Sequence, residues 1–268
     1  MSAIYETGHP KNVANLFKYN QFLATLGATY NPSNPSQTLP ALITTQATAD
    51  AKQTLVKNLE ETWKENTNLR EIAFNLLATF SVQLFSTLKT TNAPQQTLDD
   101  FLFLVNKMRG SSNTTPKSTG NKTVGTTTTN DVGTGLGTGT IGTGTSAGTK
   151  SNSQQSFDQK IEHFSKMILI LTGVPSYAPN EIPLQIASLN AQLTNLITLN
   201  SNATNSKTTL TAARIDRNTF FYAPLTGWLD TIKKTKEYIA GVYGKQSQQY
   251  KTAISFKFVR VIPKKKAN

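Results

Sequence analysis

Apolar residues along the chain recur mostly at helical spacing. Leu42, Ala49, Val56 and Trp63 repeat every seven residues, a pattern typical of a long helix packed lengthwise against its neighbours. The apolar residues of a second helix and of a shorter fourth one, separated by Asn92-Ala93-Pro94, are Leu69, Ile72, Leu76, Phe80, Leu84 and Leu88, then Leu98, Phe101, Leu102, Val105 and Met108. Together with a helix before them, these runs predict a four-helix bundle over residues 1–109.

The second half of the chain shows related patterns. They predict helices near 153–172, 181–205 and 207–242, the last bent near Pro224, and a short helix around 245–252. From Ile254 to Val261 the apolar residues alternate with polar or basic ones, and with no partner strand in sight we expect this segment to lie extended across a bundle. The predicted fold is all-α, with two tandem related antiparallel bundles, residues 1–109 and residues 153–268 with a basic tail.

A Gly/Thr-rich linker, residues 110–152, separates the two bundles. Residues 111–152 hold nine Gly and fourteen Thr, too little apolar surface to offset conformational entropy, so we expect a disordered tether. Gly137-Thr138-Gly139-Thr140-Ile141-Gly142 matches the GxGxxG dinucleotide fingerprint, but it lacks the flanking strand and helix that give this motif its chemistry. We interpret the match as a product of low complexity.

The two halves share a register that indicates an internal duplication. Tyr30-Asn31-Pro32 and Tyr177-Ala178-Pro179 each follow a helical run that ends at a glycine. The residues at equal distances from the two tyrosines are Phe17 and Phe164, Leu39 and Ile186, Leu42 and Leu189, Arg70 and Arg217, and Phe74 and Phe221. We therefore predict that the two bundles share a fold.

The chain also resembles an uncharacterised family of Bacteroidota proteins made of duplicated helical halves. The matching segments are Glu6-Thr7-Gly8-His9, Lys11-Asn12-Val13-Ala14-Asn15, Tyr30-Asn31-Pro32-Ser33, Tyr177-Ala178-Pro179-Asn180-Glu181, Ala213-Arg214-Ile215, Arg217-Asn218, Tyr222-Ala223-Pro224-Leu225-Thr226-Gly227 and Phe256-Lys257-Phe258. The resemblance implies a helical fold and no particular activity.

Composition narrows the function classes. The chain has no cysteine, which excludes disulfides and thiolate metal sites, and it has no signal-peptide pattern. No 18-residue stretch without polar residues is present, so we expect a cytoplasmic protein without a membrane partner. We also expect no cofactor, no metal and no small-molecule substrate.

Residues with catalytic potential are few. His9 and His163 have no partner at metal-ligand spacing, and Glu60, Glu61 and Glu65 lack the Glu-x-x-His of a di-iron bundle. No nucleophile elbow or phosphate-binding P-loop occurs. The segment Arg214 to Asn218 could form a basic patch, but we favour a core position for Ile215, Phe221, Leu225 and Trp228 and an ion pair of Arg217 with Asp216. We therefore predict no enzymatic activity.

Positive charge gathers at the C-terminal end. Of the net charge of +12, the stretch from Lys245 onward carries +7 and contains no acidic residue. The candidate nucleic-acid-binding residues are Lys245, Lys251, Lys257, Arg260, Lys264, Lys265 and Lys266. Two hypotheses follow: a structural or scaffolding protein that self-assembles or bridges protein partners through its duplicated bundles, or a sequence-independent nucleic-acid-binding protein that uses this basic segment.

Overall fold

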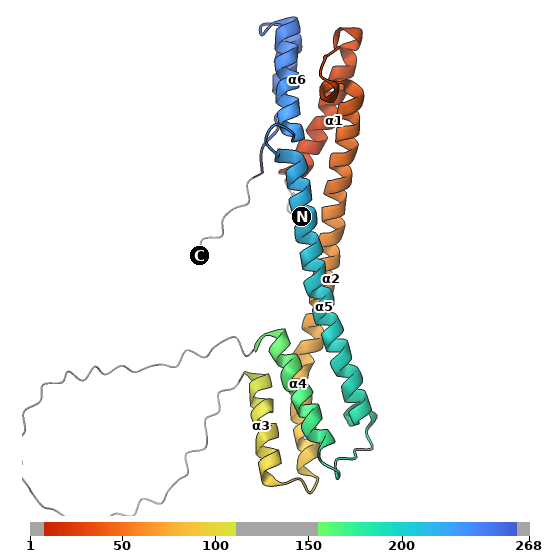
Figure 1. Ribbon diagram of the computed structural model, residues 1–268, viewed down its shortest axis with the longest axis vertical. Helices are drawn as coiled ribbons and strands as arrows, with labels where there is room; N and C mark the ends of the chain where they lie inside the picture. Colours follow the sequence, from red (N-terminus) through yellow and green to blue (C-terminus); the bar gives the residue numbers. More distant parts are fainter. Residues whose placement is uncertain (1–7, 111–154, 262–268) are drawn as a thin grey trace, which may run out of the picture. The chain divides into compact units, whose positions relative to one another are not determined.

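The computed structural model describes residues 8–110 and 155–261, and within them the predicted all-α fold class is confirmed. These residues form helices and connecting segments, without a strand (Figure 1). The α-helices are α1 (His9–Thr25), α2 (Leu39–Lys89), α3 (Gln95–Arg109), α4 (Phe157–Thr172), α5 (Ile186–Tyr222), α6 (Trp228–Tyr243) and α7 (Gln248–Ser255). Short 3-10 helices are η1 (Gly27–Thr29), η2 (Pro35–Gln37) and η4 (Ile182–Leu184). The Gly/Thr-rich linker lies outside the described residues.

Two compact units make up the fold, and each takes helices from both halves of the sequence. Unit 1 comprises Met1–Leu69 and Ser201–Asn268, and unit 2 comprises Arg70–Asn200. The units therefore do not coincide with the predicted bundles, 1–109 and 153–268. The reason is the length of α2 and α5, which have 51 and 37 residues and contribute to both units.

Helix α2 is one continuous helix where the apolar pattern predicted two. No Gly or Pro occurs between Trp63 and Leu69, so nothing in the sequence stops the helix there. The predicted seam is confirmed at Leu42, Ala49 and Val56, which are buried. The second predicted seam is partly wrong. Its first three residues, Leu69, Ile72 and Leu76, are exposed, and the buried positions are Phe74, Leu77, Ser81, Leu84 and Leu88.

The predicted bend near Pro224 is a full break between two helices. Helix α5 continues without interruption through residues 205–207, ends at Tyr222, and α6 begins at Trp228. Leu225 adopts a positive φ of 65°, which L-residues rarely adopt, and its side chain is 75% exposed. Gly227 is required by space, because a Cβ there would lie 2.7 Å from the backbone N and O atoms of Ala223.

A tyrosine closes the turn that follows the first helix of each half. The hydroxyl of Tyr30 donates to the backbone carbonyl of Gln37, and that of Tyr177 donates to the carbonyl of Leu184 at 2.9 Å. Both tyrosines are buried. Each hydrogen bond spans seven residues and fixes a 3-10 turn, η2 or η4, against the start of a long helix.

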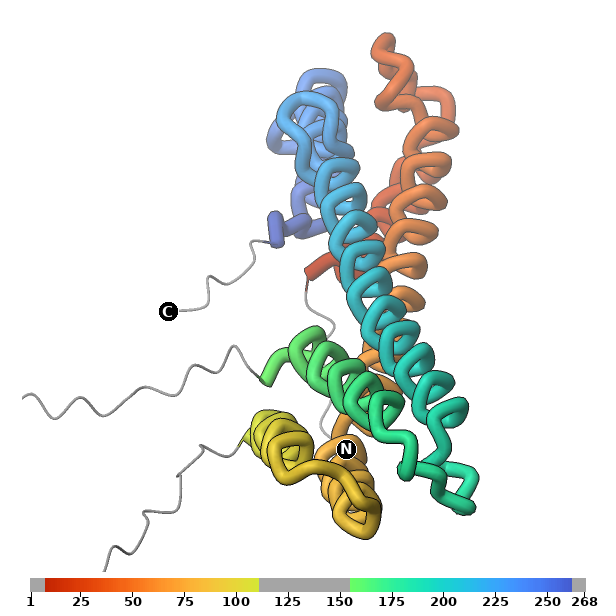
Figure 2. Tube along the Cα trace, turned by 60° about the horizontal axis from the view of Figure 1, so that its bottom comes forward, coloured from red at the N-terminus to blue at the C-terminus, as the bar shows by residue number. Residues whose placement is uncertain are grey.

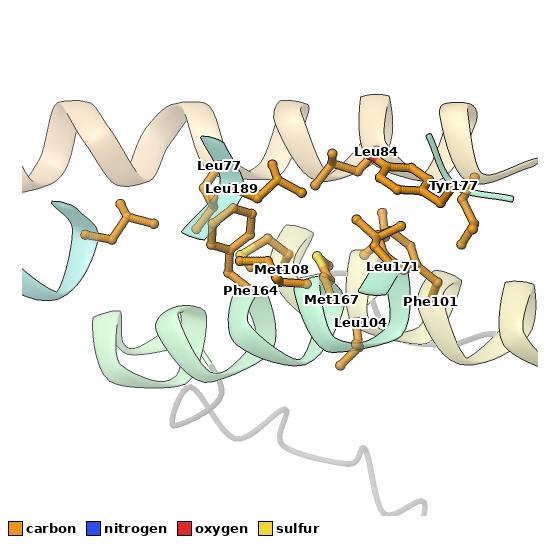
Figure 3. Packing of buried hydrophobic residues seen from close by; sticks show 14 of the residues in the cluster. Leu77, Leu84, Phe101, Leu104, Met108, Phe164, Met167, Leu171, Tyr177 and Leu189 are labelled. Carbon is orange, nitrogen blue, oxygen red and sulfur yellow. The ribbon is translucent and has the colours of Figure 1, made fainter. Parts of the chain in front are cut away.

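Helices α2, α3, α4 and α5 build the core of unit 2. In Figure 2, α3 and α4 run beside one another. Their buried side chains, among them Phe101 and Met108 of α3 and Phe164 and Met167 of α4, belong to one hydrophobic cluster. Figure 3 shows these side chains packed with others of the same cluster, which include Leu77, Leu84, Leu104, Leu171, Tyr177 and Leu189. Of the apolar residues predicted for the fourth helix, Phe101, Val105 and Met108 are buried, Leu98 is partly buried, and Leu102 is 38% exposed.

An aromatic cluster dominates the core of unit 1. Tyr19, Phe221 and Trp228 are buried there, and the ring centroids of Phe221 and Trp228 lie 5.1 Å apart. Helices α1, α2, α5, α6 and α7 contribute side chains to this cluster. The core thus joins the first helix of the chain to the last, which brings the C-terminal segment onto α1.

One helix of the described part of the chain, α2, is long and apolar enough to span a membrane by length and composition. Within its most apolar window, 28% of the residues are buried.

Candidate functional site

The basic residues predicted from the sequence lie on unit 1, apart from three outside the described residues. Lys245 lies between α6 and α7, Lys251 lies on α7, and Lys257 and Arg260 follow α7. All four are exposed. Lys264, Lys265 and Lys266 fall outside the described residues.

An extended strap, residues 256–261, carries Lys257 and Arg260. Its backbone is held by two asparagines of α1. The Asn12 amide donates to the carbonyl of Val259 at 2.7 Å and accepts from the amide of the same residue at 3.0 Å, and the Asn15 amide donates to the carbonyl of Lys257 at 2.7 Å. The strap therefore has a defined conformation, and the prediction of an extended segment lying across a bundle is confirmed from Phe256 onward, since Ile254 and Ser255 still belong to α7.

Aromatic side chains fix the inner face of the strap. Phe256 and Phe258 pack against Tyr19 of α1, with ring centroids 5.6 and 6.0 Å away. Phe258 also meets Trp228 of α6 edge to face at 5.6 Å. Because these two phenylalanines point inward, the residue between them, Lys257, is left in solvent.

Lys236 of α6 ties the strap to the other side of the unit. Its Nζ donates to the carbonyl of Phe256 at 2.6 Å and lies 5.0 Å from the ring centroid of Phe258 and 5.9 Å from that of Tyr19. Burial, and then the positive charge of Lys257, lower the pKa of Lys236 to about 8. A charge-assisted hydrogen bond and cation–π contacts thus hold Lys236 in place although the positive charge of Lys257 is nearby.

The surroundings of the strap are also basic. Helix α1 contains Lys11 and Lys18, both exposed, and no acidic residue. Over the described residues, unit 1 holds 15 Lys and Arg against 7 Asp and Glu, a net charge of +8, whereas unit 2 holds six of each. The surplus charge of the described chain therefore belongs to unit 1 as a whole.

A second feature of the strap is a hollow of about 400 Å³ beside its end. It is lined by Ile215, Asn218, Thr219 and Tyr222 of α5, by Ala223, and by Arg260 and Val261. The guanidinium of Arg260 lies 5.8 Å from the ring centroid of Tyr222. This hollow therefore combines one cation with an aromatic wall.

Sequence reasoning missed Asn12, Asn15 and Lys236, the residues that hold the strap. Asparagines three residues apart on a helix share one face, which is the available signal in Lys11-Asn12-Val13-Ala14-Asn15. That signal says nothing about what the face binds. Lys236 is not distinguishable from the neighbouring Lys233 and Lys234 by sequence.

The arginines of α5 make different contacts from those predicted. Asp216 pairs with Lys52, not with Arg217. Arg217 donates to the side chains of Gln53 and Asn218, and Arg214 pairs with Glu60 at 2.6 Å. The predicted core is correct for Phe221 and Trp228 and wrong for Ile215 and Leu225, which are 62% and 75% exposed. The segment mainly joins α5 to α2 within unit 1.

The two histidines are buried packing residues. His9 stacks edge to face on Phe221 at 5.3 Å, and burial, then Arg217, lower its pKa to about 4. Burial also lowers the pKa of His163. Among the described residues, no three His, Asp or Glu side chains come together in a way that could hold a metal ion.

Comparisons with known proteins add no relative. No family model, no curated protein and no solved structure matches the chain. The resemblance to duplicated helical proteins of Bacteroidota therefore stays a hypothesis.

Proposed function

We propose that the protein is a non-enzymatic scaffold made of two copies of one helical element, which combine reciprocally into two units with different surfaces. The contacts between α2 and α5 support the duplication. Arg70 donates to Asn200 in unit 2, at 3.2 Å, and Arg217 donates to Gln53 in unit 1, at 3.3 Å. The two arginines lie 147 residues apart in the chain, and so do their two acceptors, Gln53 and Asn200. Each copy therefore supplies the arginine to one unit and its acceptor to the other.

Burial supports the same duplication and refines its register. In α1, Leu16, Tyr19 and Leu23 are buried, and the buried Phe164, Met167 and Leu171 of α4 lie 148 residues later. Phe17, which the sequence register matched to Phe164, is 50% exposed. The two first helices thus correspond with a shift of one residue before the tyrosine turns.

The last part of α2 corresponds to α6. Leu77, Ser81, Leu84 and Leu88 are buried, and so are Trp228, Ile232, Thr235 and Ile239, each 151 residues later. Helix α2 is thus the counterpart of α5 and α6 together, with the break at residues 223–227 inserted in the second copy. On this basis α3 is the counterpart of α7.

The observation that carries the scaffold proposal is the contrast between the two units. They use equivalent elements, yet unit 1 has a net charge of +8 and unit 2 of zero over the described residues. A duplicated fold with unlike surfaces suits a protein that engages two partners, or itself and one partner. The neutral unit is the one suited to a protein contact that survives high salt.

Sedimentation velocity of the full-length protein over a range of concentrations, at low and high salt, tests this proposal. We expect self-association that persists at high salt. A strictly monomeric protein that also captures no specific protein partner in a pull-down would contradict the scaffold hypothesis.

The second candidate function is sequence-independent nucleic-acid binding by unit 1. It is favoured by Lys245, Lys251, Lys257 and Arg260, which are exposed on the unit that carries the charge surplus. Truncation before the strap is a poor test, because Phe256 and Phe258 pack on the core of unit 1. Because the four side chains are exposed, we expect their replacement by Gln to remove the charge and to preserve the fold.

Gel shifts of the full-length protein and of the quadruple Gln variant with a single-stranded oligonucleotide, at two salt concentrations, measure this function. We expect the variant to lose most of the binding, and the logarithmic salt slope to become shallower by about 0.7 for each phosphate contact removed. Unchanged binding would rule out the basic end of unit 1 as the binding surface.

A further inference from the structure

A small hollow lies between α6 and the strap. Its volume is about 170 Å³, and it is lined by three lysines, Lys233, Lys236 and Lys257, over an apolar floor. The floor consists of Leu229, Ile232, Ile254, Phe256 and Phe258. A hollow of this size is smaller than the pockets of roughly 300–1,000 Å³ that hold drug-sized ligands, so it fits a single chemical group.

Two of the three lysines have no acidic partner among the described residues. Lys233 pairs with Asp230 at 2.8 Å. Within the part of the chain that the structure describes, no carboxylate lies within salt-bridge distance of Lys236 or Lys257. The two ammonium groups instead repel one another, as the effect of Lys257 on Lys236 indicates. A pair of like charges over an apolar floor attracts an anion.

We propose that this hollow binds one phosphate group, with the ammonium groups of Lys236 and Lys257 as its two cationic donors. Lysine is a common phosphate ligand because its ammonium group is a compact charge with three donors. The phosphate comes either from a nucleic-acid backbone, a source that rests on the second candidate function, or from a free phosphate or polyphosphate.

The strap prepares this site before a ligand arrives. Asn12 and Asn15 hold the backbone on either side of Phe258, and Lys236 is already bound to the carbonyl of Phe256. Lys257 therefore starts from a fixed backbone, and binding costs little ordering beyond its own side chain. An incoming phosphate relieves the repulsion between the two lysines, which adds to its affinity.

Lysine reactivity tests the site in the full-length protein. An amine-specific acylating reagent is applied with and without inorganic phosphate, tripolyphosphate or a single-stranded oligonucleotide, and each lysine is quantified by mass spectrometry. We expect phosphate and tripolyphosphate to protect Lys236 and Lys257 and to leave Lys207, exposed on α5 in the same unit, unchanged. The proposal would be overturned if phosphate and tripolyphosphate left the reactivity of Lys236 and Lys257 as unchanged as that of Lys207.

Two variants and a matched control complete the test. Lys257→Gln changes an exposed side chain and should weaken tripolyphosphate binding about tenfold, the loss of one charge-assisted hydrogen bond. Lys236→Met should do the same, but it also loosens the strap, so Lys257→Gln is the decisive variant. Lys207→Gln removes the same charge away from the hollow and should leave binding unchanged.

The oligonucleotide separates the two sources of phosphate. If Lys257→Gln makes the logarithmic salt slope of oligonucleotide binding shallower by about 0.7, the hollow holds a backbone phosphate. If the oligonucleotide does not bind while tripolyphosphate protects both lysines, the site stands as one for free phosphate and the second candidate function fails. If the oligonucleotide binds and neither lysine is protected by any of the anions, the hollow is excluded while the candidate function survives.

Discussion

Single side chains close the turns that define this fold. The buried Tyr30 and Tyr177 donate across equal spans of chain to Gln37 and Leu184. The sequence identified both tyrosines as anchors of the register, since each precedes a proline-fixed turn. It could not reveal their hydrogen bonds, because the acceptors are backbone carbonyls and leave no trace in residue identity.

We expect Tyr30→Phe and Tyr177→Phe to destabilise the protein by similar amounts, about 1–2 kcal/mol each. The reason is that each change removes the donor to a backbone carbonyl, in a bond that is buried at Gln37 and partly buried at Leu184. Urea denaturation of the two variants measures the effect. A large loss for one variant beside none for the other would contradict the equivalence of the two turns.

His9 gives unit 1 a dependence on acid. Its folded pKa of about 4 lies below the value of 6.5 expected in the unfolded chain, so only the unfolded state takes up a proton between these values. Stability is therefore lost as the pH falls from 6.5 towards 4, by about 2–3 kcal/mol from this residue.

His9→Phe tests this dependence. Phenylalanine keeps a ring in contact with Phe221, and under the proposed duplication it stands at the matching position of the second half, Phe157. We expect the variant to fold and to lose less stability between pH 6.5 and pH 4.5 than the parent protein. Identical pH profiles of unfolding free energy would show that His9 is not the group responsible.

At the scale of elements, the sequence predicts where α-helices occur, but it does not predict where each helix begins and ends. Periodicity found the α-helical regions because apolar residues recur at helical spacing, but it joined α5 to α6 across the break that holds Pro224 and Gly227, and it divided helices where no glycine or proline marks an end. Helix α2 continues past Trp63, and α5 continues past Asn205, for this reason. Apolar residues such as Ile72 and Leu76 fit a helical seam and yet face solvent, since spacing alone cannot tell which face finds a partner.

The break between α5 and α6 depends on local geometry. Gly227→Ala should destabilise the protein by about 1–3 kcal/mol, because the added Cβ meets the Ala223 backbone at 2.7 Å. Gly241→Ala, within α6 and without any atom nearby, should stabilise it by about 0.5–1 kcal/mol. Thermal unfolding of both variants checks the contrast, and a stabilised Gly227→Ala protein would mean that this turn can relax.

At the scale of the molecule, the sequence predicted bundles over residues 1–109 and 153–268, whereas each compact unit takes helices from both halves of the chain. The predicted register relates residues of one half to residues of the other, and it carries no information on which helices pack together. The contacts decide this, since Arg214, Asp216 and Arg217 of the second half bind Glu60, Lys52 and Gln53 of the first. Of the basic candidate residues, Lys245, Lys251, Lys257 and Arg260 are exposed, and the strap that presents two of them depends on tertiary contacts that the sequence does not reveal.

Reciprocal packing makes each half of the chain dependent on the other. Unit 1 needs α1 and the first part of α2 from one half and α6 and α7 from the other, and unit 2 needs α3 and α4 together. A half expressed alone therefore exposes the apolar faces that its missing partner covers.

The most direct measurement is to express residues 1–109 and 153–268 as separate chains and to follow their folding and size alone and mixed. We expect each alone to lack a cooperative unfolding transition as a monomer, and the mixture to form a one-to-one complex that unfolds cooperatively. Two halves that each fold as stable monomers and do not combine would contradict the reciprocal assembly of the two units.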